Sequence, residues 1–266
     1  MSDVLRSDAF RRARSLVDAS SRLVVFSGAG ISAASGVPTF RDAGGLWRNH
    51  DAMQLATPQA FQRNPAMVWA WYAWRRNLVA ACQPNPAHHA IADRAGTHPP
   101  LTVVTQNVDG LHQRAGDHSV LALHGSLFVT RCTGCHHERD ESRTWTSVGA
   151  HHWPSDVGTP SCTGADPPPP RCTRCGAIER PGVVWFGESL PQSIWRAAES
   201  AVQTADLLLV VGTSATVYPA AGLVEMGRAC GCAIIVVNPD VTAHADSADV
   251  HLQASAHTIL PELLRG

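Results

Sequence analysis

The chain has 266 residues, a formal net charge of −1 at pH 7, and 16% charged residues. This balance argues against nucleic acid or an anionic membrane surface as the main partner, and no apolar stretch is long enough to cross a bilayer. The chain contains no lysine, which excludes catalysis by a Schiff-base lysine and phosphate binding by a P-loop lysine.

The arginine-rich N-terminus, residues 1–20, resembles an organelle transit peptide in composition. However, it contains Asp3, Asp8 and Asp18 and leads directly into the apolar run at residues 22–26. We therefore interpret it as the first helix of the fold and expect a soluble, cytoplasmic protein.

Short apolar runs rich in Val, Ile and Leu recur along the chain, as is typical of buried parallel strands. We predict strands over residues 22–26, 101–105, 120–124, 182–186, 206–212 and 233–238. Helical patterns at residues 190–205 and 218–231 lie between the later strands. This alternation predicts an α/β fold with a doubly wound parallel sheet and helices on both faces.

Two regions break the alternation of strands and helices. Residues 36–98 contain a glycine-rich loop and several helical patterns, and residues 131–180 contain paired cysteines and a run of prolines. We expect these two insertions to form a small second domain, while residues 1–35, 99–130 and 181–266 form the main one.

A glycine-rich loop follows the first predicted strand. Gly28, Gly30 and Ala33 have the spacing G-x-G-x-x-A, which lets the backbone approach a pyrophosphate above a helix N-terminus. A tight strand-to-helix turn is the alternative interpretation of the same glycines. Because no strand ending in Asp or Glu follows about 20 residues later, we expect dinucleotide binding beneath a large loop and not hydride transfer.

Polar residues also end the next two predicted strands. Gln106, Asn107 and Asp109 could bond a ribose and a carboxamide, although Asn107 or Asp109 could instead cap a helix. His124 ends the following strand on the same edge of the sheet. A lone histidine there is more often structural, but beside a dinucleotide it is a candidate base near neutral pH.

The paired cysteines predict a structural zinc site. Two C-x2-C pairs have the spacing of a tetrahedral site whose four thiolate ligands leave no open position: Cys132, Cys135, Cys172 and Cys175. Other possible ligands lack this paired spacing: Cys162, His136, His137, His151 and His152.

Together these motifs resemble those of the sirtuin family. The segments "GAGISAASGVPTFR", "TQNVDGLH", "LHGSLF", "VVWFGE", "VGTSATVYPAA" and "VNPD", with both cysteine pairs, occur in the order seen in sirtuins. The resemblance covers residues 20–262. It implies a Rossmann-type NAD-binding domain, a small zinc-binding domain formed by the insertions, and an active site in the cleft between them.

The resemblance also implies an activity. Sirtuins remove acyl groups from lysine side chains of other proteins and consume NAD, releasing nicotinamide and O-acyl-ADP-ribose. His124 matches the family's base, which deprotonates a ribose hydroxyl after nicotinamide has left. Alternatives are mono-ADP-ribosyl transfer, plain deacetylation, or a catalytically silent NAD-binding or zinc scaffold.

Residue by residue, the family's contacts transfer to this chain as follows. Residues matching the cofactor site are Gly28, Ala29, Gly30, Ser32, Ala33, Thr39, Phe40, Arg41, Trp47, Gln106, Asn107, Asp109, Gly212, Thr213, Ser214, Asn238, Pro239, Asp240 and Ala256. Residues matching the strand that pairs with the substrate backbone by β-augmentation are Val184, Phe186, Gly187 and Glu188.

The stretch "AWYAWRR", residues 70–76, bears on the substrate. Tyr72 and Arg75 share one face of a predicted helix; from spacing alone, the aromatic residues pack while Arg75 and Arg76 are solvated. Within sirtuins, a Tyr-x-x-Arg pair marks class III members, which prefer malonyl-, succinyl- or glutaryl-lysine. A guanidinium can bind the acyl carboxylate through two bonds and the phenol can add a third, and the small Ala33 leaves room for the acyl chain. We therefore expect desuccinylation to exceed deacetylation, with Arg76 contributing least.

Overall fold

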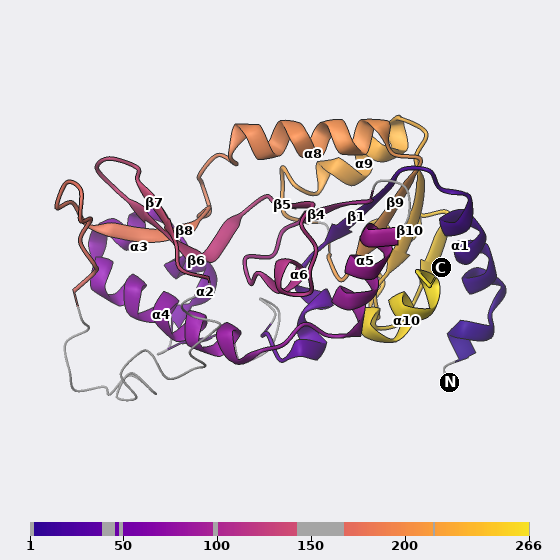
Figure 1. Cartoon of the computed structure of the whole chain (residues 1–266), viewed down its shortest axis with the longest axis horizontal. Coiled ribbons are helices and arrows are strands. Elements are labelled where there is room, and N and C mark those ends of the chain that lie inside the picture. Colours follow the sequence, from indigo (N-terminus) through magenta and orange to yellow (C-terminus); the bar gives the residue numbers. More distant parts are fainter. Residues whose placement is uncertain are drawn as a thin grey trace.

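A computed structural model describes residues 3–38, 46–47, 50–97, 101–142, 168–214 and 216–265. Figure 1 shows a large sheet with its helices and both chain termini at one end of the molecule, and a smaller assembly at the other end. No helix in these described ranges is long and apolar enough to span a membrane.

The large sheet has six parallel strands in the order β11-β10-β9-β1-β4-β5. Their bounds are β1 Leu23–Ser27, β4 Leu101–Thr105, β5 Val120–Ala122, β9 Leu207–Val211, β10 Ala233–Val237 and β11 Val250–Leu252. The strand order reverses direction at β1, as in the Rossmann fold. The predicted doubly wound sheet is confirmed, although the sequence did not indicate β11, which is only 3 residues long.

Helices cover both faces of this sheet, which explains why its strands are continuous apolar runs. On one face, η1 Asp3–Arg6, α1 Asp8–Ala19, α5 Pro86–Thr97 and α10 Ala256–Leu263 pack around alternate strand residues such as Leu23 and Val25. On the other face, α8 Gln192–Thr204 and α9 Gly222–Ala229 cover Val24 and Phe26. The predicted N-terminal helix is confirmed as α1, whose N-terminus is capped by the Ser7 hydroxyl.

The smaller assembly has its own core. It contains α2 Ala52–Leu55, α3 Pro58–Arg63 and α4 Pro65–Ala81, and an antiparallel sheet of β6 Gly125–Cys132, β7 Glu138–Asp140 and β8 Glu179–Val183. A further two-residue pair is β2 Leu46–Trp47 with β3 His50–Asp51. Helix α4 begins where the Asn64 side chain accepts a bond from the Met67 N–H, with Pro65 at the first helical position. Its aromatic residues then pack against β6 and against Trp185.

The strand predicted at residues 182–186 is wrong in both place and partner. Strand β8 ends at Val183 and pairs antiparallel with β6 instead of joining the large sheet. Beyond it, the N–H of Val184 bonds the His124 carbonyl and the N–H of Phe186 bonds the Ala56 carbonyl. The apolar run is buried between the small sheet and α3–α4, and an apolar run alone does not distinguish that position from a parallel sheet.

The domain boundaries remain a prediction, but helix α5 packs with the large sheet and not with the small assembly. Residues 36–98 were assigned to the small domain, yet Ala87 and Ile91 of α5 belong to the core of the large sheet. In Figure 1, α5 lies beside α10 at the large-sheet end.

Candidate active site

The polar residues predicted to bind a dinucleotide meet at one edge of the large sheet. The segments follow the carboxyl ends of five adjacent strands: Gly28–Gly30 after β1, Gln106–Asp109 after β4, His124 after β5, Gly212–Ser214 after β9 and Asn238–Asp240 after β10. Their centre is the junction of β1 and β9, where the strand order reverses. Ligands of doubly wound folds bind at this point.

Two glycine loops approach each other closely at this junction. The N–H of Gly28 bonds the Val211 carbonyl at 3.0 Å, and the N–H of Gly30 bonds the Gly212 carbonyl at 2.7 Å. A Cβ on Gly30 would lie 2.7 Å from that carbonyl oxygen, so a larger residue would force the loops apart. The glycines therefore serve loop-to-loop packing as well as any ligand.

The helix predicted after the glycine loop is wrong. The chain forms two short 3₁₀ turns, η2 Ala29–Ile31 and η3 Ala33–Ser35. Gly36 ends the second turn with φ 86°, a left-handed conformation that glycine adopts without strain. Pro38, two residues later, cannot donate the backbone bond that would continue the helix.

Asp109 lies at the centre of a buried polar network. Its Oδ2 accepts a bond of 2.8 Å from the Ser32 hydroxyl, and its Oδ1 accepts one of 2.9 Å from the Leu111 N–H. The Asn107 amide donates to the Gly28 carbonyl at 3.2 Å and to the Ser32 hydroxyl at 3.3 Å. Burial raises the pKa of Asp109. Gly110 is the N-cap of α6 Leu111–Arg114, and this cap makes no side-chain hydrogen bond. Asp109 precedes it, accepts the bond from the first helical N–H, and also fixes Ser32.

Two buried histidines support this network, and sequence reasoning missed both. The Asn85 N–H donates to Nδ1 of His88, so the ring proton is on Nε2. This Nε2–H donates to the Ser32 hydroxyl oxygen at 3.4 Å. His112 contacts the Ser27 hydroxyl at 2.9 Å through Nε2. Burial lowers the pKa of His88 to about 3 and that of His112 to about 4. Both rings are therefore neutral at physiological pH, and only their tertiary contacts distinguish them from exposed histidines.

The geometry of His124 suits a general base. Its Nδ1 lies 2.9 Å from the Gln106 carbonyl oxygen. Because a carbonyl only accepts, Nδ1 must carry the proton, which leaves the Nε2 lone pair to accept another. Burial lowers the pKa of His124, while the bond to Gln106 partly opposes that effect. The ring is consequently neutral and competent to take up a proton near pH 7.

The far side of the rim is tied together by Thr213. The Gln106 amide donates to the Thr213 hydroxyl at 2.9 Å, and the Asn238 amide donates to the Thr213 carbonyl at 3.1 Å. The Asp240 N–H in turn bonds the Asn238 side chain at 3.1 Å. These contacts fix the ends of β4, β9 and β10 relative to one another.

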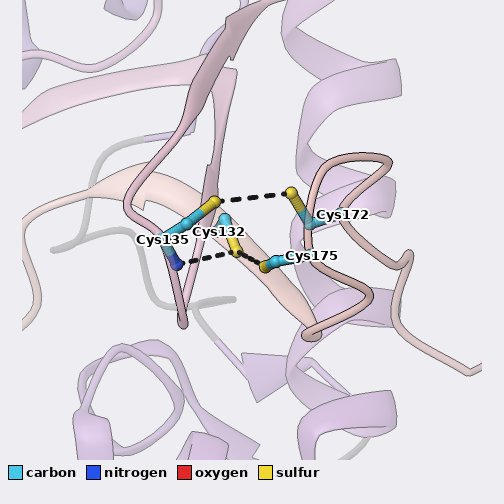
Figure 2. Close-up of side chains that lie close together, drawn as sticks. All are labelled: Cys132, Cys135, Cys172 and Cys175. Carbon is cyan, nitrogen blue, oxygen red and sulfur yellow. Dashed lines mark hydrogen bonds between the residues drawn. The ribbon is translucent and has the colours of Figure 1, made fainter.

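The four paired cysteines form one cluster (Figure 2). Their sulfur atoms all lie within 4.8 Å of one another, with Cys132 and Cys175 at 3.4 Å and Cys135 and Cys172 at 3.7 Å. The N–H groups of Gly134 and Cys135 donate to the Cys132 sulfur and lower its pKa, which favours the thiolate form of Cys132. The cluster could hold a zinc ion with four protein ligands.

Of the other histidines and the cysteine considered as ligands, only two belong to the described part of the chain. His136 and His137 are described and lie outside the cysteine cluster. His151, His152 and Cys162 fall outside the described residues.

Helix α4 places Tyr72 and Arg75 three residues apart, and Arg75 is half-buried instead of fully solvated. Tyr72 is buried, and its hydroxyl accepts a bond of 3.0 Å from the indole N–H of Trp185. The guanidinium carbon of Arg75 lies 5.2 Å from the centroid of the Trp71 ring, within cation–π range. Burial lowers the pKa of Arg75, whereas Tyr72 and Asp109 raise it. Through its bond to Trp185, Tyr72 lies beside the segment that follows β8.

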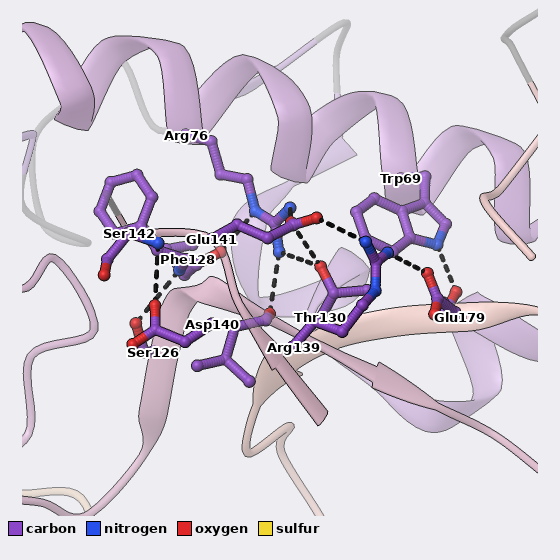
Figure 3. Close-up of polar contacts among 12 residues, drawn as sticks. Trp69, Arg76, Ser126, Phe128, Thr130, Arg139, Asp140, Glu141, Ser142 and Glu179 are labelled. Carbon is purple, nitrogen blue, oxygen red and sulfur yellow. Dashed lines mark hydrogen bonds and ion pairs between the residues drawn. The ribbon is translucent and has the colours of Figure 1, made fainter. Parts of the chain in front are cut away.

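Arg76 is buried, with 3% of its side chain exposed, and its guanidinium reaches the backbone of β6. Figure 3 shows its guanidinium among the backbone of β6 and the carboxylate of Glu141. It donates to the carbonyls of Leu127 and Val129, to the Thr130 hydroxyl, and to Glu141 at 3.1 Å. The interpretation of Arg76 as a solvated residue is therefore wrong.

Comparison with known proteins identifies the family, because the model of the Sir2 family matches residues 28–219. The chain belongs to the Sir2 family. A protein of Methylococcus capsulatus named NAD-dependent protein deacylase is 46% identical over 244 residues, which cover 91% of each chain. The crystal structure of a Sir2 homolog–NAD complex is similar with a TM-score of 0.83 and 42% identity, covering 96% of this chain and 92% of that one. A structure of Sir2 bound to an acetylated peptide has a TM-score of 0.78 and 26% identity, covering 96% and 97%.

The donor set of this Sir2 chain fits NAD. Amide and hydroxyl side chains of Gln106, Asn107 and Thr213 can bond riboses and a carboxamide, and the residues beside the glycine loop are small. Ala33 and Gly30 are exposed there, which leaves room for a pyrophosphate.

Other predicted cofactor contacts of the Sir2 chain are not observed in the structure. Thr39, Phe40 and Arg41, and the side chain of Trp47, lie outside the described residues. Ala256 is buried at the start of α10 within the core of the large sheet. Its role as an adenine contact stays a prediction.

The Sir2 segment predicted to pair with the substrate backbone is a turn and not a strand. In this turn, Phe186 is 39% exposed and Gly187 has φ 88°. Both carboxylate oxygens of Glu188 bond Arg180, at 2.6 and 2.9 Å. Glu188 therefore stabilises the turn, and pairing of Val184–Glu188 with a substrate remains a prediction.

The zinc site yields a prediction about stability. Cys175→Ser should release zinc and unfold the small sheet of this Sir2 chain, because metal binding and folding are coupled. We expect the zinc content of the purified protein, measured by mass spectrometry, to fall together with its Tm and its activity. Cys230→Ser is the matched control, since Cys230 is an exposed cysteine outside the cluster. Full activity in a zinc-free Cys175→Ser sample would contradict a structural metal.

Proposed function

We propose that this protein is an NAD-dependent protein-lysine deacylase that favours acyl groups ending in a carboxylate, such as succinyl and malonyl, over acetyl. Membership of the Sir2 family and the relative named NAD-dependent protein deacylase support the deacylase activity. The observation that supports the acyl preference is the pair of Tyr72 and Arg75, three residues apart on α4, with Tyr72 bonded to Trp185 in the segment that follows β8.

The chemistry assigned to this chain is proton transfer. When bound, NAD would supply the ribose that accepts the acyl group and nicotinamide as the leaving group. His124 would accept the ribose hydroxyl proton at Nε2, while its Nδ1–H bond to the Gln106 carbonyl holds the ring and stabilises the imidazolium. The buried network of Asn107, Asp109 and Ser32 gives the surrounding side chains fixed positions.

The acyl preference follows from the charge and burial of the two α4 side chains. The Arg75 guanidinium is half-buried and lies over the Trp71 ring. A guanidinium binds a carboxylate through two charge-assisted hydrogen bonds, which a methyl group cannot form. Burial raises the pKa of Tyr72 to about 12, so its hydroxyl stays protonated and can donate. An acetyl group ends in a methyl and can use neither donor.

Arg75→Met tests the preference directly. We expect kcat/KM for a succinyl-lysine peptide to fall by a free energy of about 1.5–3 kcal/mol, the range for hydrogen bonds to charged groups. With an acetyl-lysine peptide kcat/KM should change little, and Tyr72→Phe should act in the same direction but more weakly. Arg196→Met on α8 is the control, because Arg196 is exposed on a helix that covers one face of the large sheet. Equal losses with both substrates would make Arg75 a structural residue.

Product analysis distinguishes the remaining activities. The enzyme is incubated with NAD and a panel of acyl-lysine peptides, and the products are weighed by mass spectrometry. O-acyl-ADP-ribose supports deacylation, a modified acceptor protein indicates mono-ADP-ribosyl transfer, and unchanged NAD indicates a silent scaffold. Because the chain contains no lysine, every acyl-lysine consumed belongs to the added substrate.

A further inference from the structure

The Tyr72 hydroxyl has a buried partner that fixes the direction of its proton. The indole N–H of Trp185 donates to the Tyr72 oxygen at 3.0 Å, and both residues are buried. An indole N–H can only donate, so the phenolic oxygen must be the acceptor in this bond. The phenolic O–H is thereby kept for a second acceptor.

Trp185 itself is held from several sides. Its main-chain N–H donates to a Glu188 carboxylate oxygen at 2.9 Å, and the Phe61 ring lies with its centroid 5.2 Å away. The guanidinium carbon of Arg180 lies 3.4 Å from the Trp185 ring centroid. Glu188 also bonds Arg180, so the two charges offset each other beside the ring. The indole is therefore a rigid donor, and the ion pair adds no net charge near Tyr72.

We propose that Trp185 is a positioning residue for acyl specificity: its indole N–H orients the Tyr72 hydroxyl as a donor toward the carboxylate of the acyl group. The inference rests on the proposed function and adds a residue that does not itself touch the acyl carboxylate. A carboxylate only accepts hydrogen bonds, so a hydroxyl oriented as a donor can bind the carboxylate of a succinyl group. The methyl of an acetyl group cannot accept this bond. Accepting the indole bond also polarises the O–H and strengthens its donation.

The test is a double-mutant cycle of Trp185 and Tyr72, in which the measured quantity is the ratio of kcat/KM for succinyl and acetyl peptides. Trp185→Phe keeps an aromatic ring against Arg180 and Phe61 but removes the N–H. We expect the succinyl-to-acetyl ratio of kcat/KM to fall about 3- to 10-fold, the effect of one hydrogen bond. In a Tyr72→Phe background, the same substitution should leave the ratio unchanged, because the hydroxyl it orients is absent.

Trp69→Phe provides a matched control. Trp69 is another buried tryptophan of this core, and its indole N–H bonds the Glu179 carbonyl at 2.5 Å instead of Tyr72. Its loss should affect stability and leave the substrate ratio unchanged. If Trp185→Phe does not fold, benzothienylalanine incorporated at position 185 keeps the shape of the indole without its N–H, and the same ratio is measured.

A spectroscopic measurement is independent of turnover. The chain has 2 tyrosines, so Tyr218→Phe leaves Tyr72 as the sole tyrosine. The ring carbon bearing its hydroxyl should shift in the carbon NMR spectrum when Trp185→Phe removes the donated bond. An unchanged resonance would overturn the hydrogen-bonding role.

The outcomes separate this inference from the proposed function. If the wild type deacetylates as well as it desuccinylates, the acyl preference fails and the role of Trp185 fails with it. A second outcome would overturn only the positioning role. In that case the wild type prefers succinyl and Arg75→Met removes the preference, but Trp185→Phe lowers kcat/KM equally for the succinyl and acetyl peptides. The positioning role would also be overturned if Trp185→Phe still lowered the succinyl-to-acetyl ratio of kcat/KM in the Tyr72→Phe background.

Discussion

His124→Tyr is expected to lower the rate of deacylation by about 10²–10⁴-fold, the usual contribution of a positioned general base. The histidine is only partly buried at the end of β5, so the substitution should leave the fold intact. Nicotinamide release should fall less, because the base acts after that bond breaks in the scheme implied by the family. Rates are compared under saturating NAD with a succinyl-lysine peptide.

His124→Asn separates the base from a structural role. An asparagine amide can still donate toward the Gln106 carbonyl, as Nδ1 does at 2.9 Å in the wild type, but it cannot accept a proton near pH 7. We therefore expect it to be as inactive as His124→Tyr while unfolding at the wild-type temperature. Wild-type activity in either variant would make the assignment of the base wrong.

The pH dependence provides a second measurement of the same residue. Burial lowers the pKa of His124 below its ordinary value, so the neutral, active form should persist through pH 6.5 and be lost only in more acid solution. The wild-type kcat/KM should therefore decline in acid with a midpoint below pH 6.5. Residual turnover by the variants should lack this acid limb. An acid limb centred above pH 6.5 would contradict the burial effect.

Features that depend on spacing along the chain could be predicted from the sequence. The two C-x2-C pairs come together as one cluster, and polar residues at strand ends meet at one rim because parallel strands end on the same edge. The close approach of the glycine loops at β1 and β9 is also consistent with the G-x-G spacing.

Features that depend on tertiary partners could not be predicted. His88 and His112 lie in ordinary helical patterns, and only their contacts with Ser32 and Ser27 reveal their place beneath the cleft. The segment after β8 has strand-like composition, but Glu188 and the neighbouring carbonyls bond its backbone and turn it. In each case the local sequence permits more than one structure, and packing selects between them.

Adjacent Arg75 and Arg76 illustrate the same limit. Successive residues of a helix point about 100° apart, so one of two neighbouring arginines can face the cleft while the other faces a sheet. Nothing in the pair itself says which is which. In the structure, Arg76 bonds β6, whereas Arg75 lies over the Trp71 ring.

Arg76→Met is expected to lower the free energy of unfolding by about 3–5 kcal/mol, because several buried acceptors lose their donor at a cost of about 1–3 kcal/mol each. The Arg76 side chain is 3% exposed, and it links α4 to β6 through two backbone carbonyls, one hydroxyl and the Glu141 carboxylate. Glu141 would keep its contact with Arg139 at 3.2 Å, but the carbonyls of β6 would lose their donor without gaining water.

Arg75→Met is the matched comparison, because it makes the same chemical change one residue earlier. Denaturant unfolding of both variants should show a lower midpoint for Arg76→Met alone, whereas the succinyl-to-acetyl ratio should change for Arg75→Met alone. If Arg76→Met unfolds at the wild-type midpoint, the buried network does not hold α4 on the small sheet.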